Sequence, residues 1–436
     1  MAIPPLVSAP GPGSGTGSDP APATARVHDV LIVGGGLVGA SLAIALEHLP
    51  LDVGLIEAAP AGALPAVFDE RNLSFAEATV NALTALGVMQ KLRTPGGAIE
   101  RIHISRRGDF GRTVLDAAAH GRREFGRVVV ARDFGEALEA RLAEMPRLTR
   151  YRPLRFVGLE AGATTADERA IRVADAGGER VLRTRLLVAA DGTRSGVREA
   201  LGIASDEHGY GQALFVTRLR SARAPDGTAY ERLGDDGPTA LLPRGDRQYG
   251  LVHAVASDDA DAVAALDEAA FVARVQDAFG WRAGRFLGCG PRDRYPATRV
   301  VARRTTAARA VLVGNAAQTI HPIGAQGFNL GLRDALTLAE LIAAAAGPLI
   351  DCGSPELLAA YASRRHEDRE RTLAFSDQLA RLAANPSALL RPLRSAGLFA
   401  FDRVPSVQSL LVGGAMGYRG EVPALCRSAP AGEARR

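Results

Sequence analysis

The chain has 436 residues, of which 47% are apolar and 23% are charged, a composition typical of a globular protein large enough for two domains. The formal net charge is +4, but the arginines that dominate the positive charge are scattered rather than grouped with aromatic residues, which argues against a nucleic-acid partner. The three cysteines, Cys289, Cys352 and Cys426, are far apart without metal-ligand spacing, so we expect no metal site and a reducing, cytoplasmic location.

The first ordered part of the chain is expected to be a βαβ unit. Residues 1–26 are rich in Pro, Gly, Ser and Ala, lack the basic and apolar regions of a secretory signal, and are predicted to form a disordered tail. The apolar run Val30–Val33 predicts a buried parallel strand, Leu37–Leu49 a helix and Val53–Ile56 a second strand. This order is typical of a domain that binds a nucleotide.

Helical and β-rich stretches alternate along the rest of the chain. Helices are predicted at Ala76–Leu86, at Asp133–Leu142 with Asp133 as its cap, at Val263–Phe279 and over 355–383. Strands are predicted within 97–119, in a meander over 150–190 that closes on Leu186–Ala190, over 210–256 and at Val311–Val313. We interpret the run "RRHEDRER" at 364–371 as a solvated helix face with paired charges. The pattern predicts an α/β nucleotide-binding domain with an inserted antiparallel sheet.

A glycine turn follows the first strand. Gly34, Gly36 and Gly39 fit the G-x-G-x-x-G spacing, in which the glycines allow a tight turn, close approach of a pyrophosphate and close packing of helix on strand. The helix that follows presents unpaired N–H groups and a positive dipole end. Glu57 ends the second strand, where a carboxylate can accept a hydrogen bond from a ribose hydroxyl. The motif therefore predicts a dinucleotide site.

Two further loops follow predicted strands. Asp191 comes directly after Leu186–Ala190, although Asp191 or Thr193 could instead cap a short helix. After Val311–Val313 comes a loop of glycines and amide side chains, which leads into another helix. If the three strands lie in one parallel sheet, all three loops meet at its carboxyl edge, where ligands of such sheets bind. A ligand long enough to contact all three loops is expected.

These three motifs, in this order, resemble the GxGxxG, DG and GD fingerprints of the class A FAD-dependent aromatic monooxygenases. The stretch "VGNAAQTIHPIGAQGFNLGLRDA" is most similar to the ubiquinone-biosynthesis hydroxylases within that group. Two residues depart from the common pattern: Asn315 stands where most class A enzymes have Asp, and "PIGAQG" replaces the usual "PIAGQG" of the branch. The resemblance implies that the loop keeps its shape, and Asn at 315 is frequent in the ubiquinone branch.

The resemblance also implies roles for individual residues in binding FAD. Glycines of the first turn would hold the pyrophosphate, Glu57 the adenosine ribose, Arg71 the phosphate-ribityl region and Asn315 the ribityl chain. Arg132 matches the arginine or amide that precedes the next helix in the family. The loop after it would contact the isoalloxazine, with backbone amides facing the ring. The implied cofactor-binding residues are Gly34, Gly36, Gly39, Glu57, Arg71, Arg132, Asp191, Gly314, Asn315, Pro322, Gln326, Gly327, Phe328 and Asn329.

By the same resemblance, the fold is a Rossmann-like FAD-binding domain with an inserted antiparallel-sheet substrate domain and a helical C-terminal region. Its implied division is 1–26 tail, 27–90, 120–205 and 296–350 FAD-binding domain, 91–119 and 206–295 substrate domain, and 351–436 C-terminal region. His253 and His321 are candidates for substrate contact. His253, on a predicted strand, is expected to face the substrate pocket or the core, and His321, in a loop beside a proline, fits a structural role better than an acid–base one. No catalytic acid or base is assigned, because the flavin itself carries the chemistry.

The implied activity is NAD(P)H- and O2-dependent hydroxylation of a polyprenyl phenol in ubiquinone biosynthesis. No apolar run reaches the roughly 18 residues of a membrane span, so access to this insoluble substrate is expected peripherally at the inner membrane or through a ubiquinone-biosynthesis protein complex. Two alternatives stay open: a related flavoprotein hydroxylase or reductase for another aromatic or isoprenoid substrate, and a non-catalytic flavin-binding subunit of a biosynthetic complex.

Overall fold

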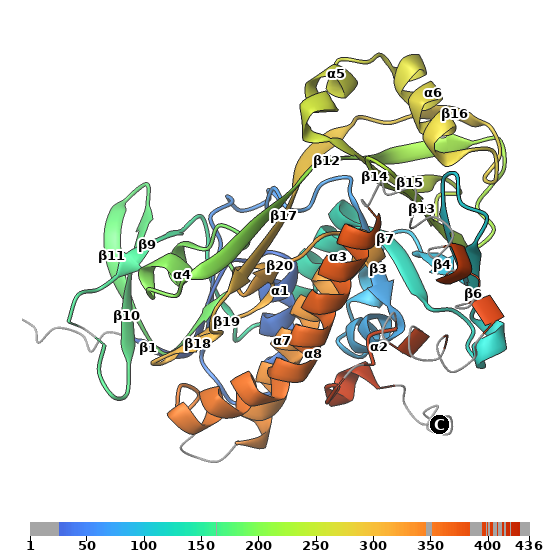
Figure 1. Ribbon diagram of the computed structural model, residues 1–436. Helices are drawn as coiled ribbons and strands as arrows, with labels where there is room; N and C mark the ends of the chain where they lie inside the picture. The colour runs from blue at the N-terminus through green and yellow to red at the C-terminus, as the bar shows by residue number, and fades with distance from the viewer. Residues whose placement is uncertain are drawn as a thin grey trace, which may run out of the picture.

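The computed structural model of the protein describes residues 26–162, 164–345 and 351–383, with 395–397, 399, 402–403, 408, 412–413, 416–418 and 420–427 (Figure 1). All but the last residue of the predicted tail 1–26 lies outside the described residues, as does much of the predicted C-terminal region after 383. No helix within the described ranges is long and apolar enough to cross a membrane.

A parallel sheet carries the three sequence motifs. Its central strands follow the order β19-β11-β1-β2-β8 and are mutually parallel. In this sheet Val33 pairs with Ala189, which in turn pairs with Leu312, so the motif loops leave neighbouring strand ends at one edge, as predicted. The strands are β1 Val27–Val33, β2 Val53–Ile56, β8 Thr149–Tyr151, β11 Gly178–Ala189 and β19 Ala310–Leu312, extended by β18 Thr306–Ala307, β10 Arg169–Asp175 and β9 Arg155–Leu159.

The strands of this sheet are apolar on both faces, so both faces must be covered, and helices cover one of them. Side chains of β1 such as Val30 and Ile32 share one core with helices α1, α2, α3, α7 and α8. The opposite face packs against β9, β10 and the short helix α4. The helices are α1 Leu37–Ala45, α2 Glu77–Ala85, α3 Ala131–Ala143, α4 Gly196–Ala200, α7 Gly327–Ala344 and α8 Pro355–Ala383.

A second, nine-stranded sheet stands beside the first, joined to it by the long strands β12 and β17 (Figure 1). Its order is β20-β17-β12-β15-β14-β13-β5-β6, with β16 paired to β12. One face packs under helix α6 (Glu268–Phe279). The strands are β5 Arg101–Arg106, β6 Arg112–Asp116, β12 Ser205–Ser221, β13 Thr228–Gly234, β14 Gly237–Pro243, β15 Tyr249–Ala256, β16 Phe286–Cys289, β17 Asp293–Ala302 and β20 Gln318–Thr319.

A third sheet has only three strands, in the order β3-β7-β4, all antiparallel. These strands are β3 Asn72–Ala76, β7 Gly126–Val130 and β4 Gly97–Ile99. Phe75 of β3 contributes to the core shared by α1 and α7. The three-stranded sheet therefore anchors the segment that follows Arg71 to the helical layer.

Two helix predictions need correction. The single helix predicted at Val263–Phe279 is two helices, α5 (Ala260–Ala264) and α6, because the Asp267 carboxylate accepts a hydrogen bond from the Ala270 N–H at 2.7 Å and starts a new helix. Helix α3 starts before the predicted cap, so Asp133 lies within its first turn, where a carboxylate favours the positive end of the helix dipole.

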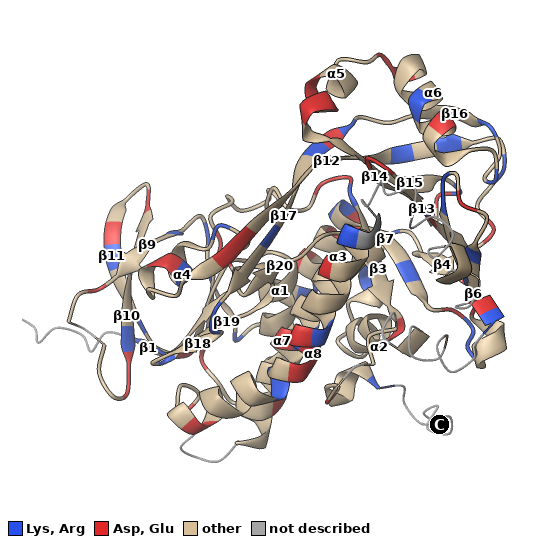
Figure 2. Cartoon of the chain, in the orientation of Figure 1, with Lys and Arg blue, Asp and Glu red and all other residues tan. Residues whose placement is uncertain are grey.

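The arginine-rich run of α8 is also not the solvated face that its sequence suggests. Arg365 and Asp368 are buried between α8 and α7, where Asp368 accepts hydrogen bonds from Arg333 at 2.7 Å and pairs with Arg365 at 2.8 Å. Only the pair Arg371–Glu367 behaves as predicted, with both side chains exposed. Figure 2 shows acidic and basic segments close together along these two helices. Helix α8 packs against α7 along one face, so some charged residues of the run are buried in that contact and others are exposed on the opposite face.

We expect Asp368→Asn to destabilise the protein by about 3–5 kcal/mol, since it removes the carboxylate that pairs with the buried Arg333 and one of the two carboxylates that pair with the buried Arg365. Burial opposes the ionisation of Asp368, but Arg333 and Arg365 outweigh it and hold its pKa below the usual value. Its stabilisation is therefore present at neutral pH and is lost as the pH falls through the folded-state pKa. Urea unfolding at neutral and acidic pH measures both effects.

The matched control is Glu367→Gln, which removes one carboxylate from the exposed face of the same helix and should change stability by less than about 1 kcal/mol. Equal losses for the two variants would show that the buried network does not hold α8 against α7.

Candidate functional site

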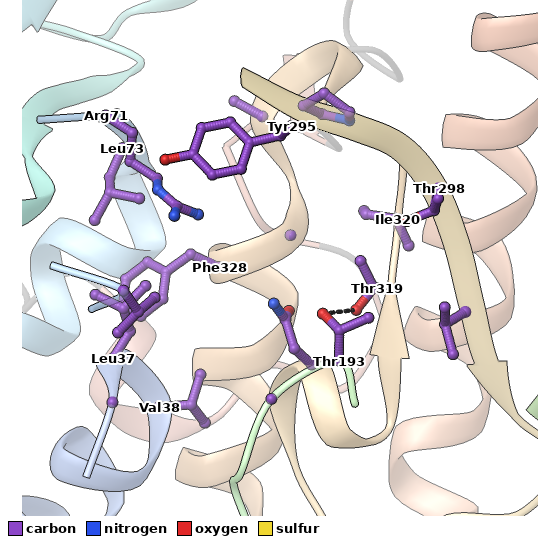
Figure 3. A pocket seen from close by; sticks show the side chains of 18 of the residues that line it. Leu37, Val38, Arg71, Leu73, Thr193, Tyr295, Thr298, Thr319, Ile320 and Phe328 are labelled. Carbon is purple, nitrogen blue, oxygen red and sulfur yellow. Dashed lines mark hydrogen bonds between the residues drawn. The ribbon is translucent and has the colours of Figure 1, made fainter. Parts of the chain in front are cut away.

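One large cavity, of about 1390 Å³, lies where the carboxyl edge of the parallel sheet faces the second sheet. Its walls include the glycine turn after β1, the Asp191 loop, the loop after β19, and side chains of β13, β14 and β15. Typical ligand pockets have roughly 300–1,000 Å³. The cavity therefore has room for a dinucleotide and a second molecule. Figure 3 shows the part of the cavity near Arg71 and Phe328.

The glycine turn is shaped as its spacing predicts. Gly34 has φ +107°, and a Cβ at Gly39 would lie 2.0 Å from the Gly34 carbonyl oxygen, so these two positions need glycine for backbone reasons. A Cβ at Gly36 would meet only Val67 Cγ1, at 3.5 Å. No side chain among the described residues caps α1, which leaves its first N–H groups for a ligand. A side chain at Gly36 would therefore be tolerated by the protein's own packing but would obstruct a ligand.

Glu57 is fixed next to this turn. Its carboxylate accepts hydrogen bonds from the Gly35 N–H at 2.9 Å and the Ala59 N–H at 2.7 Å. Each carboxylate oxygen has a second lone-pair direction available for a hydroxyl donor. Since Glu57 lines the cavity, this arrangement suits a ribose beside the helix N-terminus.

Asp191 has a ligand-facing position and a local structural role. Its carboxylate accepts hydrogen bonds from Ser195 Oγ at 2.5 Å and from the Val197 N–H at 3.1 Å. Burial raises the pKa of Asp191 despite these bonds. The side-chain cap of α4 is Ser195, which accepts from the Arg198 N–H at 2.9 Å. Neither Asp191 nor Thr193, the candidates from the sequence, is that cap.

Arg198 joins two of the three motif loops. Its guanidinium donates to the Thr193 carbonyl at 3.0 Å and to the Ala316 carbonyl at 2.9 Å. A second link runs between the hydroxyls of Thr193 and Thr319, at 2.8 Å (Figure 3). The Asp191 loop and the loop after β19 are consequently held as one surface.

The turn after β19 is held from behind by a buried carboxylate. Asp334 of α7 accepts from the Gly314 N–H at 3.1 Å and from Gln318 Nε2 at 2.6 Å, and Arg365 donates to its other oxygen at 2.7 Å. Asn315, by contrast, is exposed into the cavity, and its side chain bonds to none of the described residues. Its amide is therefore free to bond to a ligand.

The next part of the loop brings both backbone and side chains to the cavity, among them the side chain of Phe328 (Figure 3). Pro322, Gly327 and Phe328 line the cavity, while the Gln326 side chain turns back to donate to the Gly324 carbonyl at 3.1 Å. No described side chain caps α7, so its first N–H groups face outward as those of α1 do. This geometry agrees with the implied contact between backbone amides and a flat ring.

Asn329 has a structural role that the sequence did not reveal. Its side-chain oxygen accepts from the Ala76 N–H at 2.9 Å and Thr79 Oγ1 at 2.7 Å, and its nitrogen donates to the carbonyls of Ser74 and Ala325, both at 2.9 Å. All four bonds are internal. The side chain therefore fastens the loop to β3 and α2, and Asn329 is not among the residues that line the cavity.

Ala325 has a strained, left-handed backbone conformation, which follows from the order Gly324-Ala325 in place of the usual Ala-Gly of the branch. Its φ is +50°, next to Gly324 at +71°. A residue with a Cβ costs about 1–2 kcal/mol in this region. The loop therefore has two consecutive left-handed residues, and the surrounding bonds, including the one from Asn329 to the Ala325 carbonyl, keep it there.

Arg71 and Arg132, both implied by the resemblance to be cofactor-binding residues, differ in position. Arg71 reaches the cavity, where Asp69 holds it at 2.6 Å and the Tyr295 ring stacks 4.5 Å from its guanidinium (Figure 3). Burial and the hydrogen bond to Asp69 raise the pKa of Tyr295 to about 12. Arg132 instead pairs with Glu70 at 3.1 Å on the surface, half exposed and away from the cavity walls. Nothing in the sequence pointed to Tyr295, which is 226 positions from Asp69.

Neither candidate histidine lines the cavity. His253 lies on the opposite face of β15 from Val252, bonded to Thr239 Oγ1 at 2.9 Å and packed near Phe271. His321 is buried with Gln212 at 3.2 Å from its Nε2. Burial lowers the pKa of each to about 4. Both are neutral at pH 7 and belong to the protein core.

The described residues fit FAD. Two uncapped helix N-termini, a fixed carboxylate at Glu57, a free amide at Asn315 and an arginine at the cavity wall lie along one continuous space. These are donors and acceptors that suit a pyrophosphate, a ribose, a ribityl chain and a flat polar ring. A bound flavin would supply hydride acceptance and reaction with oxygen. The chain contributes binding, orientation and exclusion of water.

Comparisons with known proteins agree with this geometry. A family model described as an FAD binding domain matches residues 27–376. Ubiquinone hydroxylase UbiL of Rhodospirillum rubrum is 36% identical over 416 residues, 93% of this chain and 94% of that protein. Human ubiquinone biosynthesis monooxygenase COQ6, mitochondrial, is 28% identical and covers 89% of this chain and 92% of its own length. The crystal structure of p-nitrophenol 4-monooxygenase PnpA from Pseudomonas putida shares the fold, with a TM-score of 0.74, 17% identity, and coverage of 91% of this chain and all of that one.

Substitutions at Gly36 and Gly39 should have different effects on FAD binding and on folding. We expect Gly36→Ala to leave the apoprotein as stable as the wild type within about 1 kcal/mol but to weaken FAD binding by tenfold or more, because the new Cβ meets no backbone and instead faces the pyrophosphate position. Gly39→Ala should destabilise the apoprotein itself. Titration of apoprotein with FAD and urea unfolding distinguish the two, and equal effects on both properties would contradict the assignment.

The free amide at Asn315 should tune the flavin. We expect Asn315→Asp to retain FAD but to lower its reduction potential by roughly 30 mV, equivalent to about 1.4 kcal/mol for a two-electron couple, because a negative charge near the flavin opposes the anionic reduced form. The control, Gln90→Glu, adds the same charge on the surface away from the cavity. Spectroscopic redox titration measures the potential, and an unchanged or higher value for Asn315→Asp would refute the role.

Proposed function

This chain belongs to the ubiquinone hydroxylase family of FAD-dependent monooxygenases, and from that premise we propose that it hydroxylates the ring of a polyprenyl phenol in ubiquinone biosynthesis, with NAD(P)H and O2. The loop at 313–335 and the sheet segment "AYERLGDDGPTALLPRGDRQYGLVHAV" resemble the ubiquinone-biosynthesis hydroxylases, and the overall pattern resembles 2-polyprenyl-6-methoxyphenol hydroxylase. We propose a substrate of that class, a phenol with an isoprenoid tail next to its hydroxyl.

The observation that carries this proposal is the composition of the cavity wall opposite the flavin loop. The wall comes from the second sheet and includes Ala240, Leu242 and Val252 of β14 and β15, together with Leu214 and Val216 of β12. Such a wall favours an apolar aromatic ring and the first units of an isoprenoid tail. It lies across the cavity from backbone donors, so a ring bound there would face a flavin bound along the three motif loops.

The tail of such a substrate requires a route from the membrane. We propose that the protein meets it peripherally, at the inner membrane or within a ubiquinone-biosynthesis protein complex, since a polyprenyl chain has a large apolar surface that water disfavours. No helix in the part of the chain that the structure describes could span the bilayer. Access from the surface of the membrane is consistent with that finding.

Two measurements test the proposed function. Deletion of the gene should leave its host with an under-hydroxylated quinone precursor, and a normal quinone profile would refute the pathway assignment. With purified protein and ¹⁸O2, one labelled oxygen atom should enter the phenol ring for each NAD(P)H consumed in coupled turnover. Reduction of a substrate without oxygen insertion would instead identify a reductase.

A further inference from the structure

We propose that Glu231 touches the hydroxyl of the phenol substrate and accepts its proton during hydroxylation. This inference rests on the proposed function, because it assigns a residue to the phenol end of that substrate. It concerns a carboxylate in the wall of the second sheet, which lies outside the three sequence motifs but lines the same cavity.

The strand β13 directs Glu231 into the cavity. Side chains alternate along a strand, so Ala229, Glu231 and Leu233 share one face of β13. Leu233 packs in a small buried cluster with Ile323, which belongs to the loop expected beside the isoalloxazine. Glu231 is two residues away on the same face, roughly 7 Å along the strand. That spacing places the carboxylate close to the loop but not against it, with room for a ring between them.

The neighbours of Glu231 across the sheet are apolar. It pairs with Ala240 of β14, Ala240 with Val252 of β15, and Val252 with Val216 of β12. All four side chains belong to residues that line the cavity. On the three strands β13, β14 and β15, Glu231 is the only charged residue among those that line it. A single carboxylate in an apolar wall can orient a ligand that has one hydroxyl and is otherwise apolar.

The carboxylate of Glu231 has no protein partner within the described chain: no hydrogen bond or ion pair reaches it. The other two carboxylates at the FAD side of the cavity, Glu57 and Asp191, are each held by two donors. A half-buried carboxylate without donors costs stability, since nothing replaces its lost hydration. A ligand that donates a hydrogen bond to the Glu231 carboxylate would offset this cost and explain why a carboxylate lies there. Burial raises the pKa of Glu231 to about 7, which makes it a stronger base than an ordinary carboxylate.

The proposed step moves one proton. The Glu231 carboxylate takes the proton of the phenol hydroxyl, the O–H bonding pair stays on the phenol oxygen, and the ring becomes more electron-rich. That ring then reacts with the electrophilic oxygen that the flavin and O2 supply, and Glu231 releases its proton to water after the product leaves. Below pH 7 the residue is increasingly protonated and cannot accept, so the step should accelerate as the pH rises through about 7.

Binding tests the contact directly. The probe is 2-prenylphenol, a phenol with one isoprene unit, and its affinity is read from the change in flavin absorbance on both sides of pH 7. We expect the wild type to bind it about tenfold more tightly above this pH than below, as for a hydrogen bond to a charged group. Glu231→Gln should lose that pH step. The methyl ether of the probe has no hydroxyl proton and should bind both proteins equally, without the step.

Turnover tests the proton transfer. Glu231→Gln should reduce its flavin with NAD(P)H at the wild-type rate in the presence of the probe, yet form hydroxylated product about 100-fold more slowly and release hydrogen peroxide instead. The matched control is Asp236→Asn, which removes an exposed carboxylate from the turn between β13 and β14 and should leave product formation unchanged. The Gln variant retains the size of the side chain, and urea unfolding should show it at least as stable as the wild type above pH 7.

The outcomes separate the two proposals. A pH step or a product rate in Glu231→Gln equal to the wild type would overturn the role of Glu231, as would an equal loss of affinity for the methyl ether. If the wild type binds the phenol with a pH step that Glu231→Gln lacks, but inserts no oxygen into it, the contact stands and the proposed hydroxylation fails.

Discussion

The site depends on one buried set of charges between helices α7 and α8. Asp334 bonds to the turn after β19 on one side and to Arg365 on the other, and Asp368 completes the set with Arg333 and Arg365. A buried carboxylate is tolerated only when donors surround it, so the position of α8 and the position of the turn fix each other. Helix α8, which has no residue in the three motifs, thereby holds the loop that presents Asn315 in place.

The cavity has two walls with different chemistry because two sheets meet there. The parallel sheet supplies strand ends, glycines and helix N-termini, which offer backbone donors at fixed positions. The antiparallel sheet supplies a flat face of small and branched apolar side chains, with its other face buried under α6. A polar cofactor suits the first wall and an apolar ring the second. Arg71, held by Asp69 and stacked on Tyr295, belongs to both, since Tyr295 comes from the second sheet.

The parts that the sequence predicted well are those set by local rules. Apolar runs identified β1, β2 and β19, and the spacing of Gly34, Gly36 and Gly39 predicted a turn that only glycine permits. One error missed a local cap, and the other arose where a packing neighbour decided the outcome. Asp267 interrupts a helix that looks continuous, and packing against α7 buries half of an arginine-rich face that looks solvated.

The sequence by itself therefore determined the order of the motifs and their fit to a dinucleotide, because both depend on residue type at fixed short spacing, while its resemblance to known hydroxylases indicated FAD and the branch of the family. Only the tertiary structure decided which side chains meet across the cavity. The side chain of Asn329 is satisfied by internal hydrogen bonds, both histidines face away from the cavity, and Glu231 lies in an apolar wall with no partner among the residues that the structure describes. The role of each of these side chains depends on how deeply it is buried and on which hydrogen-bond partners reach it. Both depend on segments far apart in the chain, which no local sequence pattern connects.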